Sequence, residues 1–342
     1  MKKIRVALIG YGYWGPNLAR NILLNKDYEL ICIVDTDADR TKLADASHGV
    51  KVYNSISRIE SLEQMDLAVI ATGPASHKDL VEFFATQGVN CLVTKPITAG
   101  YYDALEVQAL ADRHGIKVYC DFTYHFSPLI NFLLSDARAT NIICNMKEYV
   151  SYRTSLGIIQ SDVDVVADLA VHDIYILKLI KGSLPSQVKC ISLGLTPEIQ
   201  VQSAFISLKW LDGFNASIHV SWKSPKKMRF ISIVSDSDGI VVEEMNQSNP
   251  IQIISISPEF SNSVNLPVNL VKSRNESYTI GQIESPVIER VESLTTEFKM
   301  LSEAIKSKNS TFPNILDAVG IWSVVEAIRK SISRDGTYID VT

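Results

Sequence analysis

The chain has 342 residues, of which 46% are hydrophobic and 21% charged, and its formal net charge is -5. This length is long for one hydrophobic core, so we expect two domains with the composition of an ordinary globular protein. The acidic balance offers no basic surface to nucleic acid, and no apolar run reaches the roughly 18 residues of a membrane helix, so we expect neither as a partner.

The N-terminus, MKKIRVALIG, is basic and then apolar, as a secretory signal peptide is. Its apolar part is only about six residues long and runs straight into glycines, so we interpret it as a β-strand. The 5 cysteines are scattered and form no C-x-x-C pair. They predict buried, reduced thiols and a cytoplasmic location.

Strand-like and helix-like stretches alternate through residues 1–121. Apolar, β-branched runs predict strands at 3–9, 30–34, 67–71, 90–94 and 116–120. Helical spacing begins near Pro16 and recurs at 36–46, 77–87 and 101–114. This alternation predicts an α/β Rossmann domain with a doubly wound parallel sheet.

The sequence GYGYWG lies between the first predicted strand and the first predicted helix, with Gly10, Gly12 and Gly15 in G-x-G-x-x-G spacing. Glycines there let the backbone approach a pyrophosphate, which the N-terminus of the helix attracts. We therefore predict a dinucleotide site that includes Tyr13 and Trp14. A plain strand-to-helix turn is the alternative.

Asp35 ends the second predicted strand and is followed by Thr36. A carboxylate at this position accepts hydrogen bonds from the adenosine ribose and repels a 2′-phosphate, so NAD is favoured over NADP. Arg40 weakens this preference, because it could reach a 2′-phosphate. The alternative role for Asp35 is the N-cap of the next helix.

The third and fourth predicted strands also end in polar residues. Thr72 and Gly73 follow the third strand, and Lys95 follows the fourth. In a doubly wound sheet these ends lie at the edge where ligands bind. A lysine there can stabilise alkoxide charge on a substrate, although a surface lysine after a strand is the alternative.

Residues 161–185 carry apolar side chains at helical spacing. Asp168 and His172 are four residues apart, so an α-helix would put them on one face. This pair is typical of a general base oriented by a carboxylate, with a half-buried ion pair as the alternative. We expect no metal site, because the stretch has one histidine and no H-x-x-x-H.

These motifs resemble those of the Gfo/Idh/MocA family of NAD(P)-dependent sugar and cyclitol oxidoreductases. ATGPASH is similar to the family's A-T-P-P-x-x-H segment along the cofactor, which would place His77 at the cofactor's edge. Lys95-Pro96 matches the end of its E-K-P motif, and DLAVHD matches its D-x-x-x-H-D helix. The resemblance implies a substrate-binding Lys95, an acid/base His172, and an Asp168 that orients substrate or histidine.

The sequence departs from the family pattern at three positions. Thr94 stands where the family usually has Glu, and Gly73 replaces the first proline of the P-P pair. His125 stands where many members have Arg, near the predicted junction between the domains, where it could contact a ligand.

Longer stretches, including GYGYWGPNLARN and SWKSPKKMRFISIV, resemble members that oxidise the sugar of a UDP-linked hexose at C3. This implies a UDP-linked hexosamine or its uronate as substrate. Arg153, Lys227 and Arg229 offer cations for its diphosphate, unless they are solvated surface charges. An inositol or free-sugar dehydrogenase, a ketosugar reductase and a non-catalytic NAD-binding regulator are the alternatives.

Residues 122–342 follow a different pattern. Strand-like runs occur at 141–152, 188–192, 202–210, 214–222, 229–235, 239–243 and 251–256, a polar loop at 257–281, and helices near 287–307 and 314–333. They predict an α+β domain with an open, mostly antiparallel sheet. An open sheet face needs cover, so we expect a homodimer or homotetramer assembled through this sheet.

Overall fold

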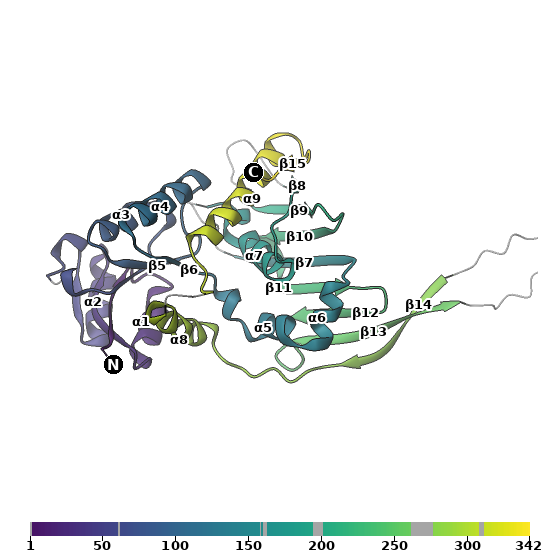
Figure 1. Cartoon of the computed structure of the whole chain (residues 1–342), viewed down its shortest axis with the longest axis horizontal. Helices are drawn as coiled ribbons and strands as arrows, with labels where there is room; N and C mark the ends of the chain where they lie inside the picture. The colour runs from purple at the N-terminus through teal and green to yellow at the C-terminus, as the bar shows by residue number, and fades with distance from the viewer. Residues whose placement is uncertain are drawn as a thin grey trace, which may run out of the picture.

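The computed structural model describes residues 2–60, 62–157, 159, 163–193, 201–260, 276–307 and 311–342. Two β-sheets lie side by side, one from the N-terminal third of the chain and one from the remainder (Figure 1). None of the helices in the described part combines the length and apolar character that crossing a membrane requires.

The first sheet is parallel and six-stranded, in the order β3-β2-β1-β4-β5-β6. Its strands are β1 (Ile4–Ile9), β2 (Tyr28–Val34), β3 (Lys51–Tyr53), β4 (Leu67–Ile70), β5 (Asn90–Thr94) and β6 (Val118–Asp121). Its crossover helices are α1 (Gly15–Leu24), α2 (Ala38–His48), α3 (His77–Thr86) and α4 (Tyr101–His114). The predicted doubly wound sheet is confirmed, and its order reverses between β1 and β4, where a ligand crevice forms.

The first sheet is buried on both faces, which explains its continuous apolar strands. Val6 and Leu8 of β1 pack in one core with α1 and α8 (Ser293–Lys306), while Ala7 and Ile9 face the other core with α3. Helix α9 (Ile315–Ser333) packs on α4. The two C-terminal helices thus pack against the part of the chain that contains the first sheet. The boundary between two domains at residue 121 stays a prediction.

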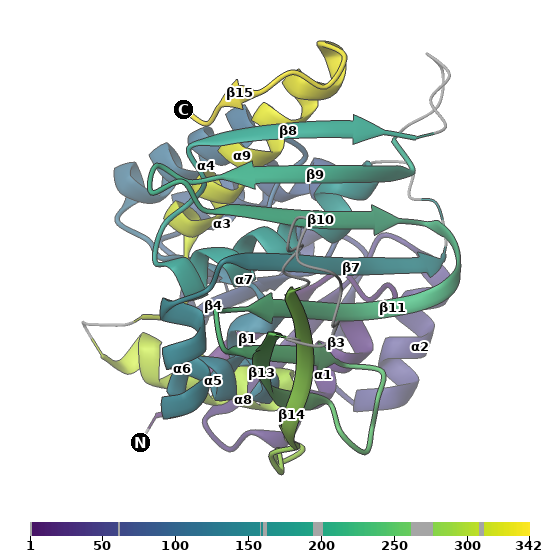
Figure 2. The ribbon, with the colours of Figure 1, turned by 90° about the vertical axis from the view of Figure 1, so that its right-hand side faces the viewer.

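The second sheet is mixed and nine-stranded, in the order β14-β13-β12-β11-β7-β10-β9-β8-β15, and only β7 and β10 pair in parallel. Its strands are β7 (Glu148–Leu156), β8 (Gln187–Ser192), β9 (Ser203–Lys209), β10 (Asn215–Ser221), β11 (Lys223–Val234), β12 (Asp238–Glu243), β13 (Ile251–Phe260), β14 (Glu276–Glu284) and β15 (Ile339–Asp340). Helices α5 (Pro128–Ser135), α6 (Ala137–Cys144) and α7 (Val171–Lys181) cover one face, and Figure 2 shows the other face open. The predicted open, mostly antiparallel sheet is confirmed.

Three predicted elements are wrong. The strand predicted at 141–152 begins only at Glu148, because Asp136 accepts hydrogen bonds from two backbone amides and starts helix α6 ahead of it. The loop predicted at 257–281 is wrong at both of its ends, which belong to β13 and β14. These strands pair through backbone hydrogen bonds, which need no apolar pattern in the sequence. Residues 261–275 of the predicted loop lie outside the described part. The helix predicted from 287 begins at Ser293.

Candidate active site

Two of the three glycines between β1 and α1 are required by packing. Gly10 has a φ of +97°, and a Cβ there would lie 2.7 Å from the Ala71 backbone. A Cβ on Gly15 would lie 2.7 Å from the carbonyl oxygen of Gly10. At Gly12, by contrast, a Cβ would meet only the Arg40 side chain, at 3.5 Å. The open backbone at Gly12 therefore fits the close approach of a pyrophosphate.

Alanine at Gly12 and alanine at Gly10 are expected to have different effects. Gly12→Ala should unfold within about 2 °C of the wild type but bind NAD at least about tenfold more weakly, because the methyl group occupies the surface the pyrophosphate approaches. Gly10→Ala should lose about 2 kcal/mol or more of unfolding free energy through its strained backbone. Thermal unfolding and calorimetric NAD titration measure both. Wild-type NAD affinity in folded Gly12→Ala would contradict the predicted site.

Asp35 is held rigidly at the end of β2, with 7% of its surface exposed. Its carboxylate accepts the backbone N–H of Tyr11 at 2.7 Å and that of Asp37 at 2.9 Å. Asp37, rather than Asp35, caps helix α2, so the alternative role for Asp35 is ruled out. The Arg40 guanidinium lies 3.8 Å from the Asp35 carboxylate, beside the glycine loop.

NAD is expected to bind more tightly than NADP by about tenfold or more, because the fixed Asp35 carboxylate would face the 2′-position of a bound ribose. Asp35→Ser should narrow the difference between the two dissociation constants, and Arg40→Ala should widen it. Titrating both nucleotides into the three proteins measures this. An equal or reversed preference in the wild type would mean that Arg40 outweighs Asp35.

The other predicted cofactor residues lie at the same sheet edge. Tyr13 is 94% exposed, Thr36 is exposed, and the half-buried Trp14 donates its indole N–H to Asp121 at 3.0 Å. All three follow the carboxyl end of β1 or β2, as the sequence predicts.

His77 has a different place from the one its motif predicts. The ring is completely buried, with its Nε2 2.9 Å from the Thr72 carbonyl and its Nδ1 3.1 Å from the Ile97 carbonyl. It therefore ties the loop after β4, which contains Thr72 and Gly73, to the loop after β5. A direct contact of His77 with the cofactor does not fit this burial.

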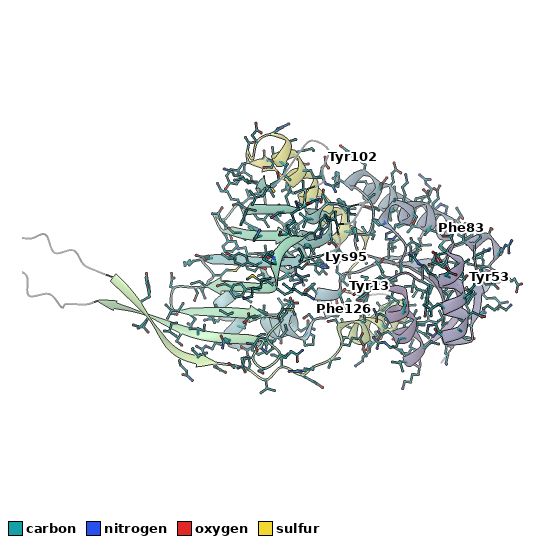
Figure 3. The ribbon with its side chains drawn as sticks, turned by 180° about the vertical axis from the view of Figure 1, so that it is seen from behind. Tyr13, Tyr53, Phe83, Lys95, Tyr102 and Phe126 are labelled. Atoms are coloured by element: carbon teal, nitrogen blue, oxygen red, sulfur yellow. The ribbon has the colours of Figure 1, made fainter. Side chains whose placement is uncertain are left out.

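Lys95 and Asp168 meet as an ion pair between the two sheets, where Figure 3 labels the lysine. The Lys95 ammonium donates to Asp168 twice, at 2.8 Å to Oδ1 and 2.6 Å to the backbone carbonyl. Trp222 donates its indole N–H to the other carboxylate oxygen at 2.9 Å. An ammonium has three donors, so one donor of Lys95 remains for a substrate oxygen. Asp168 thus gives Lys95 a carboxylate partner, although Thr94 stands where the family usually has Glu.

The predicted pairing of Asp168 with His172 is wrong. Asp168 lies in a π turn, Val166–Ala170, just before α7. Because a π turn is wider than an α turn, residues four apart no longer lie one above the other. The Asp168 carboxylate consequently turns to Lys95 and Trp222.

His172 lies at the edge of a cavity, with its ring 5.1 Å from that of Tyr124. Burial, followed by the positive charges of Lys95, Arg153 and Arg229, lowers the pKa of His172 well below its ordinary value. The predicted gain in basicity from a carboxylate is therefore reversed. At neutral pH the imidazole is neutral, and a neutral imidazole can accept a proton.

Arg153 is 2% exposed and is committed to other side chains. It forms a buried ion pair with Asp173, at 2.7 Å and 3.3 Å, and donates to the Tyr124 hydroxyl. The predicted contact of Arg153 with a substrate diphosphate is therefore wrong. Arg153 instead holds Tyr124, whose hydroxyl donates to Glu244 at 2.9 Å, beside His172.

Arg229 is the half-buried cation that stays available at this site. One of its amino groups donates to the backbone carbonyls of Met228 and Thr154, at 2.9 Å and 3.2 Å. In the described part of the chain, no carboxylate lies within 4.0 Å of its guanidinium. Burial and the charge of Arg153 lower the pKa of Arg229, so an anion would be favourable there. Lys227, on the same strand, is exposed.

His125 is not among the described residues that line the cavity around His172. Its Nδ1 lies 3.0 Å from the Tyr175 hydroxyl of α7, and burial lowers its pKa. The predicted ligand contact for His125 has no support in this arrangement. The sequence patterns do not predict a role for its neighbour Tyr124 or for Trp222, because their partners come from distant segments.

A cavity of about 820 Å³ extends from His172 and Tyr124. Trp14 lines it on the side of the first sheet, and residues 246–250 and 285–291 line its far end, among them Arg290. Its volume lies near the upper end of the range for ligand sites, roughly 300–1,000 Å³. The cavity therefore has room for a ligand much larger than one sugar ring.

The glycine loop and the fixed Asp35 have the geometry expected of an NAD-binding site. Residues 4–122 match the model of a family described as an oxidoreductase family with an NAD-binding Rossmann fold. This match over the first third of the chain agrees with the resemblance of its motifs to the Gfo/Idh/MocA family.

Among curated relatives, D-apiose dehydrogenase of Paraburkholderia graminis is 26% identical over 54% of this chain and 51% of its own length. UDP-N-acetylglucosamine 3-dehydrogenase of Acidithiobacillus ferrooxidans is 22% identical over 61% of this chain and 64% of its own. The chain thus spans about half to two thirds of these relatives' length.

Solved structures share the fold over nearly the whole chain. The Acidithiobacillus ferrooxidans enzyme superposes with a TM-score of 0.78 and 18% identity, covering 98% of this chain and 99% of that one. An oxidoreductase from Agrobacterium radiobacter in complex with NAD+, L-tartaric acid and magnesium gives a TM-score of 0.80 and 18% identity, covering 99% of each chain.

Proposed function

We propose that this protein is an NAD-dependent dehydrogenase that oxidises a CH–OH group of a sugar. The observation that carries the proposal is that Lys95, which has one unused N–H donor, lies close enough to His172 for its charge to lower the histidine's pKa. His172 is neutral and lines a large cavity. A binding-only protein needs neither a proton acceptor nor a hydrogen-bond donor that stabilises an alkoxide, so the regulator alternative is disfavoured.

In this mechanism His172 accepts the proton of the substrate hydroxyl. The free N–H of Lys95 donates to the same oxygen and stabilises its developing negative charge. Asp168 and Trp222 fix Lys95 in position. When bound along Gly12 and Asp35, NAD supplies the acceptor for the hydride.

We further propose that the substrate is a UDP-linked hexosamine or its uronate, oxidised at C3. Its support is the size of the cavity, Arg290 at its far wall, and the half-buried Arg229, which forms no ion pair in the described part of the chain. The resemblance of this chain to a UDP-N-acetylglucosamine 3-dehydrogenase points the same way, whereas that to D-apiose and myo-inositol dehydrogenases favours a free sugar.

A substrate panel tests both levels of this proposal. NADH absorbance would be followed with UDP-N-acetylglucosamine, its uronate, D-apiose and myo-inositol, and with 2-oxoglutarate-driven recycling in case NADH stays bound. Turnover of the free sugars alone would overturn the nucleotide substrate and leave the dehydrogenase intact. Turnover of none, by a protein that binds NAD, would favour the regulator.

Arg229→Ala is expected to raise KM for an anionic substrate by about tenfold or more, since a charged hydrogen bond contributes roughly 1.5–3 kcal/mol. Its effect on kcat should be smaller than its effect on KM, because the proposed mechanism gives Arg229 no contact with the reacting oxygen. Lys227→Ala removes an exposed charge from the same strand and serves as the control. Equal KM values in the two variants would remove Arg229 from the substrate site.

We also propose that the open face of the nine-stranded sheet pairs with a second copy of the chain, giving a homodimer or homotetramer. Ile191 and Phe205 are 53% and 46% exposed on this sheet. Light scattering on Phe205→Asp would measure the loss of assembly. The cytoplasmic location stays a prediction that rests on the scattered cysteines.

A further inference from the structure

A buried pair of carboxyl groups lies where α8 meets the end of β6. Glu297 of α8 is 0% exposed, and Asp121 at the end of β6 is 2% exposed. Neither oxygen of Glu297 receives a hydrogen bond from an N–H or O–H donor in the described part of the chain. The group that faces it is the Asp121 carboxyl.

Two buried carboxylates cannot both be ionised at such close range, so one of them keeps a proton. Burial and the adjacent negative charge of Asp121 raise the pKa of Glu297 well above its ordinary value. Burial raises the pKa of Asp121 as well, but its carboxylate is better stabilised than that of Glu297. It accepts N–H and O–H bonds from Trp14 and Thr123, each at 3.0 Å, and Lys95 lies near it. Glu297 therefore holds the proton and donates it toward Asp121.

The third member of this arrangement, Trp14, faces two ligand sites at once. It precedes α1 in the dinucleotide loop, and its side chain lines the large cavity. Its indole N–H is bound to Asp121, so the position of its ring depends on that carboxylate. Asp121 pairs across the sheet with Thr94, the residue before Lys95.

We propose that Asp121 and Glu297 act together as positioning residues, sharing one proton and fixing Trp14 as the wall between the dinucleotide loop and the substrate cavity. This inference assigns no role in the chemical step to either residue. The inference rests on the proposed function where it calls the cavity a substrate site. The effects of the Asp121–Glu297 pair on Trp14 and on NAD binding do not depend on any substrate.

Three variants separate this role from ordinary packing. Glu297→Gln keeps the shape and a neutral donor, so NAD affinity, KM and Trp14 emission should stay within about twofold of the wild type. Glu297→Met keeps similar bulk but has no donor, so NAD affinity should fall and KM rise by about fivefold, with kcat within about threefold. Trp14→Phe keeps an aromatic ring but loses the N–H, so it should reproduce the changes in KM and NAD affinity.

Emission of Trp14 is obtained as the wild-type spectrum minus that of Trp14→Phe, and iodide quenching of it should increase in the Glu297→Met background. Unchanged NAD affinity and quenching in folded Glu297→Met would overturn the proposal and leave a packing role. If Glu297→Met does not fold, the NAD affinity of Trp14→Phe is the test. An affinity equal to that of the wild type would then overturn the proposal. Absence of turnover in the wild type would count against the proposed function but would leave these two binding measurements valid.

Discussion

Lys95→Ala is expected to lower kcat by about 10³-fold or more. In the proposed mechanism the substitution removes the N–H donor to the substrate oxygen and the positive charge beside it, and such a donor contributes about 10²–10³-fold. It also leaves the Asp168 carboxylate, only one fifth exposed, next to the developing alkoxide without its cation. Steady-state rates at saturating NAD measure the loss.

Two controls accompany this variant. Lys117→Ala removes an exposed lysine just before β6 of the same sheet and should leave kcat unchanged. NAD affinity of Lys95→Ala should stay close to the wild type, because Gly12 and Asp35 carry the proposed cofactor contacts. A kcat within threefold of the wild type would mean that Lys95 is bound to Asp168 for structural reasons only.

The first sheet could be predicted from sequence because its strands are short apolar runs that end in glycine, aspartate or lysine. Strand β3 was missed, since it has three residues that are exposed or half-buried and therefore no apolar pattern. Helix α6 was mistaken for a strand because its apolar residues, including Ile142 and Ile143, are consecutive. Periodicity cannot separate these cases, and the cap at Asp136 decides this one.

The sequence identifies several residues of the candidate site but not the side chains that they contact. Lys95, Asp168 and His172 were found because each lies in a short motif. The partner of Arg153, by contrast, is Asp173, which lies 20 residues further along the chain on α7. The partner of Asp121 is Glu297, which is more distant still in the sequence. Such contacts depend on how the two sheets and α8 pack, which local sequence patterns do not encode.

His172→Ala is expected to lower kcat by about 10²–10⁴-fold, the usual contribution of a general base. In the proposed mechanism Lys95 and His172 act on the same oxygen, so the double variant should lose much less than the product of the single losses. His125→Gln, on the neighbouring turn and bonded to Tyr175, is the matched control and should change kcat little. Near-normal kcat in His172→Ala would mean that water or another group takes the proton.

The pH dependence gives a second measure of the same residue. Burial and three neighbouring cations lower the pKa of His172 well below 6.5, so the wild-type kcat/KM for oxidation should be flat near neutral pH and fall only well below pH 6.5. Because the unfolded chain binds the proton more readily, the stability linked to His172 is present above about pH 6.5 and is lost as the pH falls toward the folded-state pKa. The wild type should therefore lose stability over this window more steeply than His172→Gln, which has no such group. Equal slopes for the two proteins, or an acid limb of kcat/KM above pH 6.5, would mean that the folded structure does not lower the pKa of His172.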